Sequence, residues 1–141
     1  MWGADTVHAQ IASDNAFEGA KCEKIIEDPI EAGTGVVQSI CATEHYIICI
    51  ENTGDDTNAP DVIKAYYRND VDEFGNPVER YSLAKRVADM DYEHANGMAY
   101  NPNTGEIAVA LYTSNDWQNR GSIYLMDAGT LAFKSRVQVS D

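Results

Sequence analysis

The sequence predicts an all-β chain whose antiparallel four-stranded sheets are blades of a β-propeller fragment. Three observations predict this fold: short apolar runs are separated by turn residues, the runs recur at one spacing, and basic side chains gather in the last run of each copy. Short strands with regular turn signals indicate an all-β domain. A long internal repeat indicates an architecture made of successive, similar units.

The repeat appears when the chain is shifted by 61 residues. Segment 46–50 then lies on 107–111, and segment 62–66 lies on 123–127 without a gap. The polar loops between the two segments have the same length in both copies and are rich in Asn, Asp and Gly, which favour turns. Because separate segments share one offset, we expect two copies of one strand–loop–strand unit.

First and last strands complete each copy. A first strand is expected at 38–42 and, after three extra residues are allowed in the turn that follows it, at 96–100; a last strand is expected at 81–87 and 132–139. The last strands carry the basic residues Lys85, Arg86, Lys134 and Arg136. Because charged side chains block pairing at a sheet edge, we expect these strands to lie at the solvated edge of each sheet.

The second strands, 46–50 and 107–111, are apolar at every position. This pattern predicts burial on both faces of the strand. Sheets stacked face to face bury both sides of their inner strands, as propeller blades do. A β-sandwich or a barrel also fits short strands with turn signals, and the long repeat favours the propeller over both.

The repeat divides the chain into a partial preceding blade at 1–34, a first full blade at 35–90 and a second full blade at 91–141. A closed propeller needs at least about four blades. We therefore expect one structural domain that is incomplete by itself. Its remaining blades would come from the same protein or from other copies of the chain.

Charge excludes some classes of partner. Ten basic and 23 acidic side chains give a formal net charge of -13, which repels nucleic acid and anionic membrane surfaces. No apolar run approaches the roughly 18 residues of a membrane-spanning helix, so we expect no membrane insertion. The first residues lack a secretory signal. This predicts either a cytoplasmic protein or one that is secreted or displayed at the cell surface after a leader is removed.

Three cysteines, Cys22, Cys41 and Cys49, leave at least one thiol unpaired and show no Cys-x-x-Cys spacing. Free cysteines commonly behave as small apolar residues, so we expect reduced, buried thiols rather than a zinc site. The sequence leaves open whether two of the three form a disulfide.

The strongest candidate site contains Glu93, His94 and Asn96, at the entry to the first strand of the second copy. In a propeller this position faces the mouth of the central channel, where ligands and metals are held. The alternation of an extended chain predicts His94 and Asn96 on one side and Glu93 on the other. We expect a ligand-binding site here; in the alternative interpretation, His94 only hydrogen-bonds the neighbouring backbone.

A second candidate site contains Asp116, Trp117 and Arg120, in the polar loop of the second copy. A Trp ring in a polar loop offers a stacking surface for a sugar or an aromatic ligand. In the alternative interpretation, the Trp117 ring packs into a small core of its own loop.

Three segments of the second copy, 96–102, 104–110 and 121–127, resemble β-propellers of the NHL and YVTN type. They are more loosely similar to gluconolactonase-like and streptogramin-lyase-like propellers. The resemblance covers about residues 38–141. In the gluconolactonase-like group it implies a divalent metal held by Asn96 and Glu93, and in the lyase-like group it implies that His94 transfers a proton near magnesium.

We therefore expect a non-catalytic binding module that uses channel-mouth loops to bind a protein or glycan ligand and needs no cofactor. The alternative is a metal-dependent propeller enzyme of the lactonase or lyase type, with His94 as the candidate catalytic residue. A purely architectural segment of a larger ring is a third possibility. No nucleophile elbow, Walker loop, dinucleotide fingerprint or His-Glu-x-x-His motif occurs in the sequence.

Overall fold

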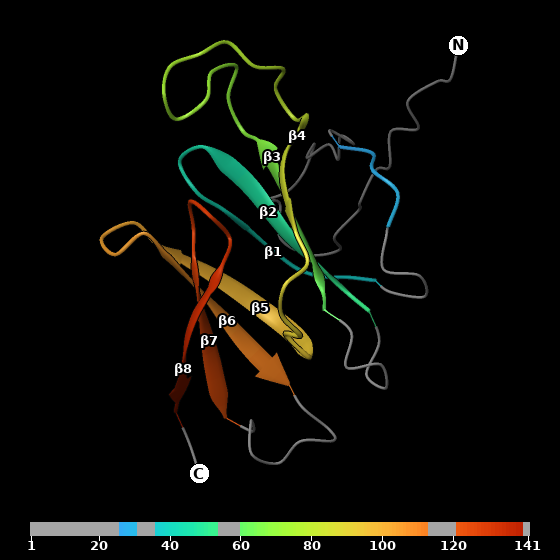
Figure 1. Ribbon diagram of the computed structural model, residues 1–141, viewed down its shortest axis with the longest axis vertical. Helices are drawn as coiled ribbons and strands as arrows, with labels where there is room; N and C mark the ends of the chain where they lie inside the picture. Colours follow the sequence, from blue (N-terminus) through green and yellow to red (C-terminus); the bar gives the residue numbers. More distant parts are fainter. Residues whose placement is uncertain (1–25, 31–35, 54–59, 113–120, 140–141) are drawn as a thin grey trace, which may run out of the picture.

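The computed structural model describes residues 26–30, 36–53, 60–112 and 121–139 (Figure 1). All of the strands and sheets named below lie within these residues. The strands are β1 (Val36–Ala42), β2 (Tyr46–Asn52), β3 (Val62–Tyr67), β4 (Leu83–Val87), β5 (His94–Asn101), β6 (Glu106–Tyr112), β7 (Ser122–Asp127) and β8 (Phe133–Gln138). The predicted all-β class is confirmed, and each predicted strand is present within a few residues of its expected position. No helix in the described part of the chain could span a membrane.

The strands form two antiparallel four-stranded sheets, each in sequence order. We call β1–β4 the N-terminal sheet and β5–β8 the C-terminal sheet. Short turns join β1 to β2, β5 to β6 and β7 to β8. In the last of these, Asp127 Oδ1 accepts hydrogen bonds from the N–H groups of Gly129 and Thr130. As predicted, the basic last strands β4 and β8 lie at sheet edges; β8 exposes most of its side chains, whereas β4 exposes Leu83 and Arg86 and half-buries the others.

The two sheets repeat at an offset of 60 residues over their second and third strands. In the N-terminal sheet the pairing of β3 with β4 shifts between Ala65 and Tyr66, and in the C-terminal sheet the pairing of β7 with β8 shifts between Leu125 and Met126. The pairings of β2 with β3 and of β6 with β7 agree with this offset. The 61-residue alignment expected from the sequence is therefore wrong by one residue. The offset of 61 aligns slightly more apolar residues, because 60 puts Tyr46 on Glu106, but a slip of one residue exchanges the two faces of a strand.

The first strands, β1 and β5, are related by a different offset. The sequence alignment, which places 38–42 on 96–100, predicted this offset correctly. The pairing of β1 with β2 shifts between Val37 and Ser39, and that of β5 with β6 shifts between Ala95 and Gly97. The extra residue of the bulge is Gln38 in one sheet and Asn96 in the other, so these two residues are equivalent.

Equivalent positions define two faces of each sheet. Face A of the N-terminal sheet contains Ile48, Ile50, Ile63 and Ala65, and face A of the C-terminal sheet contains Ala108, Ala110, Ile123 and Leu125. Face B of the N-terminal sheet contains Ile47, Cys49, Lys64 and Tyr66, and face B of the C-terminal sheet contains Ile107, Val109, Tyr124 and Met126.

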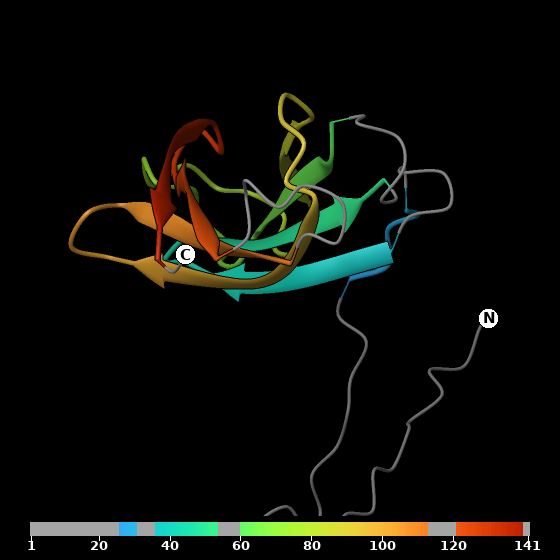
Figure 2. The same ribbon diagram turned by 90° about the horizontal axis from the view of Figure 1, so that it is seen from below.

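The hydrophobic core lies between face A of the N-terminal sheet and face B of the C-terminal sheet, whose side chains are buried in one cluster. Tyr92, Ala95 and Leu131 complete this cluster and are fully buried. Strands β1 and β5 run side by side along one margin of the packed sheets (Figure 2). The two sheets thus pack in one direction, with unlike faces in contact, as successive units of a repeat do.

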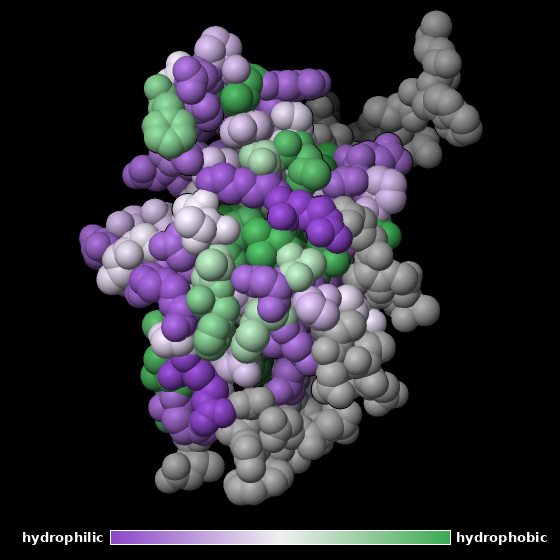
Figure 3. All heavy atoms as spheres, viewed as in Figure 1, coloured by the Kyte–Doolittle hydropathy of each residue, from purple (hydrophilic) through white to green (hydrophobic). Residues whose placement is uncertain are grey.

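Burial differs between the two second strands. The prediction of burial on both faces is confirmed for β2, where only Ile47 is partly exposed, and is wrong for β6, where buried and exposed residues alternate. The exposed positions of β6 belong to face A of the C-terminal sheet. In the space-filling view, hydrophilic side chains surround apolar ones gathered toward the middle of the visible surface (Figure 3).

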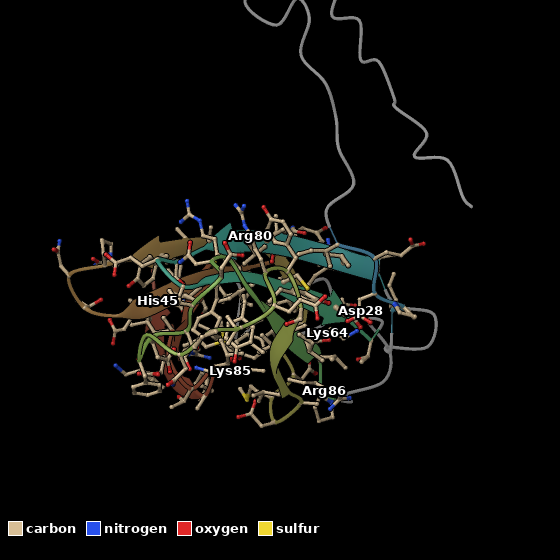
Figure 4. The ribbon with its side chains drawn as sticks, turned by 90° about the horizontal axis from the view of Figure 1, so that it is seen from above. Asp28, His45, Lys64, Arg80, Lys85 and Arg86 are labelled. Carbon is tan, nitrogen blue, oxygen red and sulfur yellow. The ribbon has the colours of Figure 1, made fainter. Side chains whose placement is uncertain are left out.

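Charged groups are buried on face B of the N-terminal sheet. The Lys64 ammonium is fully buried, and its Nζ lies 2.8 Å from Glu51 Oε1 and 3.3 Å from Asp28 Oδ2. Nζ also donates a hydrogen bond to the carbonyl of Pro29 at 2.9 Å. The hydroxyl of Tyr66 donates to Asp28 Oδ2 at 2.7 Å and lowers the pKa of that carboxyl. Segment 26–30 therefore covers part of face B through polar contacts (Figure 4).

Cys41 and Cys49 are free thiols, and Cys22 lies outside the described residues. Burial raises the pKa of both described thiols to about 11. They are therefore protonated at neutral pH and serve as small apolar side chains.

Candidate functional site

The candidate site lies at the seam where β1 and β5 run side by side. Across this seam Gln38 Nε2 donates a hydrogen bond to Asn96 Oδ1 at 3.0 Å. Both residues are the extra residue of a bulge, and both are at least partly exposed. A bulge bends its strand and redirects a side chain. Equivalent bulges in the two sheets thus bring two amide side chains together at the surface.

The bulge also changes how His94 and Asn96 are related. Ala95 is fully buried in the core, so alternation places the neighbouring His94 on the opposite face of β5. Alternation then stops at Asn96, because the bulge adds one residue there. His94 pairs with Tyr112 of β6, and their rings meet edge to face with centroids 6.0 Å apart. The amide pair of Gln38 and Asn96 and the ring pair of His94 and Tyr112 therefore both lie at the start of β5.

Glu93 shapes the entry to β5 through its backbone. Its φ is 51°, in the left-handed region that non-glycine residues seldom adopt. The Glu93 N–H donates to Asp91 Oδ1 at 2.7 Å, and its carbonyl accepts a hydrogen bond from the side-chain amide of Asn52. These contacts hold a conformation that costs about 1 kcal/mol or more.

Asp61 anchors the same loop from the N-terminal sheet. Its buried carboxylate accepts hydrogen bonds from the Tyr92 N–H at 2.7 Å and the Thr53 N–H at 2.9 Å. The Asp61 N–H in turn donates to the carbonyl of Met90 at 3.0 Å. Burial raises the pKa of Asp61 to about 6, although the hydrogen bonds from Thr53 and Tyr92 oppose this rise. The entry to β5 is thus built on a buried acid of the other sheet.

Sequence reasoning missed Asp61 and Asn52, which position the site without facing solvent. Their contacts join residues 31 and 41 positions apart, a separation at which no local pattern predicts a partner. One signal was available for Asp61. It is an acidic residue placed directly before a run of strand residues, where a solvated turn residue is otherwise expected.

The structure brings three of the predicted site residues to one place and adds Gln38 and Tyr112 to them. The predicted residues Asp116, Trp117 and Arg120 lie outside the described residues. Among the described residues, no cluster of three or more His, Cys, Asp or Glu side chains could hold a metal ion. The atom of Asn96 that would bind a cation, Oδ1, accepts the hydrogen bond from Gln38.

The chemistry of the seam favours neutral, polar ligands. Two amide groups offer donors and acceptors together, and the exposed ring of Tyr112, which contacts His94 at the same end of β5, offers an apolar surface. Peptide groups and sugar hydroxyls fit such a surface. The net charge of -13 disfavours anionic ligands.

No protein family, curated protein or solved structure matches this chain. The fold class and the geometry of the seam are therefore the basis on which we infer a function. The resemblance to NHL and YVTN propellers stays a prediction.

Proposed function

We propose that the two sheets are consecutive blades of a β-propeller and that the chain is a non-catalytic binding module for a protein or glycan. The packing of unlike faces supports the propeller. Each blade of such a ring places the same face against the next blade, whereas two equivalent sheets related by a two-fold axis would join like faces. The first strands, β1 and β5, then line the central channel.

The observation that carries the binding function is the hydrogen-bonded pair of Gln38 and Asn96. Equivalent bulges at the same strand end direct both amides toward the proposed channel mouth. The amide groups that the hydrogen bond between Gln38 and Asn96 leaves available, Gln38 Oε1 and Asn96 Nδ2, suit a peptide backbone or a sugar, and the Tyr112 ring at the same strand end adds an apolar surface. A ligand of this kind gains hydrogen bonds from the amides and apolar contact from the ring.

The test is a titration of the 15N-labelled chain, followed by NMR, with two panels of probes: neutral oligosaccharides and synthetic peptides. We expect one panel to shift the side-chain amide signals of Gln38 and Asn96. In Asn96→Ala we expect at least about tenfold weaker binding, the loss of one good hydrogen bond. Asn103→Ala, in an exposed turn, is the matched control. Shifts confined to other surfaces, or equal affinities of the two variants, contradict the proposal.

The enzyme alternative has no observation in its favour among the described residues. A thermal melt with calcium, magnesium or zinc separates the two functions. The binding module is expected to show no change in Tm, whereas a rise with one metal that Asn96→Ala abolishes supports the metal-dependent enzyme.

A further inference from the structure

Face A of the C-terminal sheet is an apolar surface that stays accessible. It continues onto the neighbouring strands β5 and β8 and is half-buried or exposed throughout. Its side chains are Ala99, Ala108, Ala110, Ile123, Leu125 and Val137. Contiguous exposed apolar surface of this kind marks an interaction site.

The N-terminal sheet shows what covers this face. Its equivalent residues Ile48, Ile50 and Ile63 are all fully buried. They are buried because face B of the following sheet packs on them. The partner that fits face A of the C-terminal sheet is therefore another face B.

The opposite end of the chain presents a face B that is only partly covered. Segment 26–30 closes its outer part through Asp28 and Pro29. On β1, however, Val37 is 50% exposed and Ile40 is 63% exposed. Their equivalents in the C-terminal sheet are Ala95, which is fully buried, and Met98, which packs against the core. The inner part of this face B thus exposes apolar side chains at positions that the internal interface buries.

We propose that a second copy of the chain docks here, with face A of one C-terminal sheet on the inner part of face B of the next N-terminal sheet. The docked interface continues the contact that already joins the two sheets within one chain. It joins unlike faces, so each copy keeps one free face for a further copy. Such a head-to-tail contact is propagated from copy to copy and gives a ring when its rotation closes. This inference depends on the proposed blade arrangement but not on the proposed ligand.

The first test is the mass of the chain in solution, measured by sedimentation velocity over a range of concentrations. We expect a particle that is a multiple of the 15.5 kDa chain. Ala110→Glu on face A and Ile40→Glu on face B each place a charge in the docked interface, and both positions are exposed in the single chain. Each variant alone is expected to be monomeric with an unchanged circular dichroism spectrum. Asn103→Glu, in an exposed turn, is the charge-matched control and is expected to assemble.

Mixing the two variants distinguishes the polarity of the contact. Ala110→Glu keeps an intact face B and Ile40→Glu keeps an intact face A, so an equimolar mixture is expected to form a dimer and nothing larger. A monomeric wild-type chain overturns the proposal, and so does a mixture that stays monomeric. If only Ala110→Glu dissociates the particle, two A faces are joined by a two-fold axis, which also overturns it.

The ligand titration is read separately. Assembly without shifts at Gln38 and Asn96 leaves the docking inference standing and removes the binding function. A monomer that still shows those shifts contradicts the docking inference and supports the binding function.

Discussion

The N-terminal and C-terminal sheets share strand order and bulge positions, yet they fill face B with different chemistry. Lys64 and Cys49 of the N-terminal sheet stand where the C-terminal sheet has Tyr124 and Val109. The C-terminal face B packs on another sheet and is apolar, whereas the N-terminal face B meets segment 26–30 and is charged. At equivalent positions of the two sheets, the residue type therefore follows from the surface that packs against it.

The largest expected effect comes from removing the buried ammonium. Lys64→Met leaves Glu51 buried without its 2.8 Å partner, and we expect a loss of about 3–5 kcal/mol in the free energy of unfolding, measured with urea. Adding Glu51→Leu, the residue of the equivalent position Leu111, is expected to restore most of it. If the double variant is as unstable as Lys64→Met, the loss does not come from leaving the Glu51 carboxylate buried without a partner, and this explanation is wrong.

The matched control is Lys134→Met. Lys134 also contacts a carboxylate, Glu106, at 2.6 Å, but it lies exposed on β8. An exposed pair is screened by water, so we expect a much smaller change than at Lys64.

A second pair of variants compares face A in the two sheets. Ile63 is fully buried and its equivalent Ile123 is partly exposed. We expect Ile63→Ala to cost about 2–4 kcal/mol and Ile123→Ala less than half of that. Urea unfolding is measured in the Ile40→Glu background, so that docking of copies does not contribute and the added charge is not on face A. Equal losses would show that face A is already covered in the single chain.

Asp61 provides a contrast in pH dependence, because its equivalent in the C-terminal sheet is Gly121, which cannot titrate. The folded pKa of about 6 is above the usual 3.8, so the folded state binds more protons than the unfolded state between these values. Stability therefore falls as pH rises from about 4 to 6, by on the order of 3 kcal/mol, and is constant above. Asp61→Asn is expected to remove this fall in urea unfolding curves recorded across the window. A fall of the same size in the variant would assign it to other carboxyls.

The smallest expected effect concerns the entry to β5. Glu93 holds a left-handed φ, and the sequence counterpart in the first copy is Gly35. Glycine adopts this conformation without a steric cost, so we expect Glu93→Gly to be more stable than Glu93→Ala by about 1 kcal/mol. Thermal unfolding of the two variants checks this. A more stable alanine variant would mean that the entry takes another conformation in solution.

The strands were predictable because apolar runs and turn residues are local signals. The offset was not, because the wrong offset of 61 aligns slightly more apolar residues than 60, which puts Tyr46 on Glu106 and Val62 on Ser122; backbone pairing identifies 60. Small residues could have predicted the exposure of β6. Ala108 and Ala110 alternate with larger apolar side chains, and these two alanines lie on the accessible face of the strand. In β3 the signal was Lys64, a charge within an apolar strand, which required a buried partner.

The site was predictable in part. His94 and Asn96 stood out because they lie at the entry to the first strand of the second copy, where a propeller faces its channel mouth. The pairing of Asn96 with Gln38 depends on a bulge, and nothing in a stretch of six residues distinguishes a bulged strand from a regular one. The support from Asp61 and Asn52 depends on how two sheets meet, which is a property of the packed molecule.

The contact of Lys64 with Asp28 and Pro29 has a mechanical consequence. It fixes a segment outside the sheets to the third strand of one of them, through an ion pair and a carbonyl hydrogen bond. A pulling force applied at the N-terminus reaches these bonds before it reaches the ladders of the sheets. We expect single-molecule extension to show an early rupture that occurs at lower force in Lys64→Met with Glu51→Leu, where the hydrogen bond from Tyr66 to Asp28 remains, while the force that separates the strands stays the same.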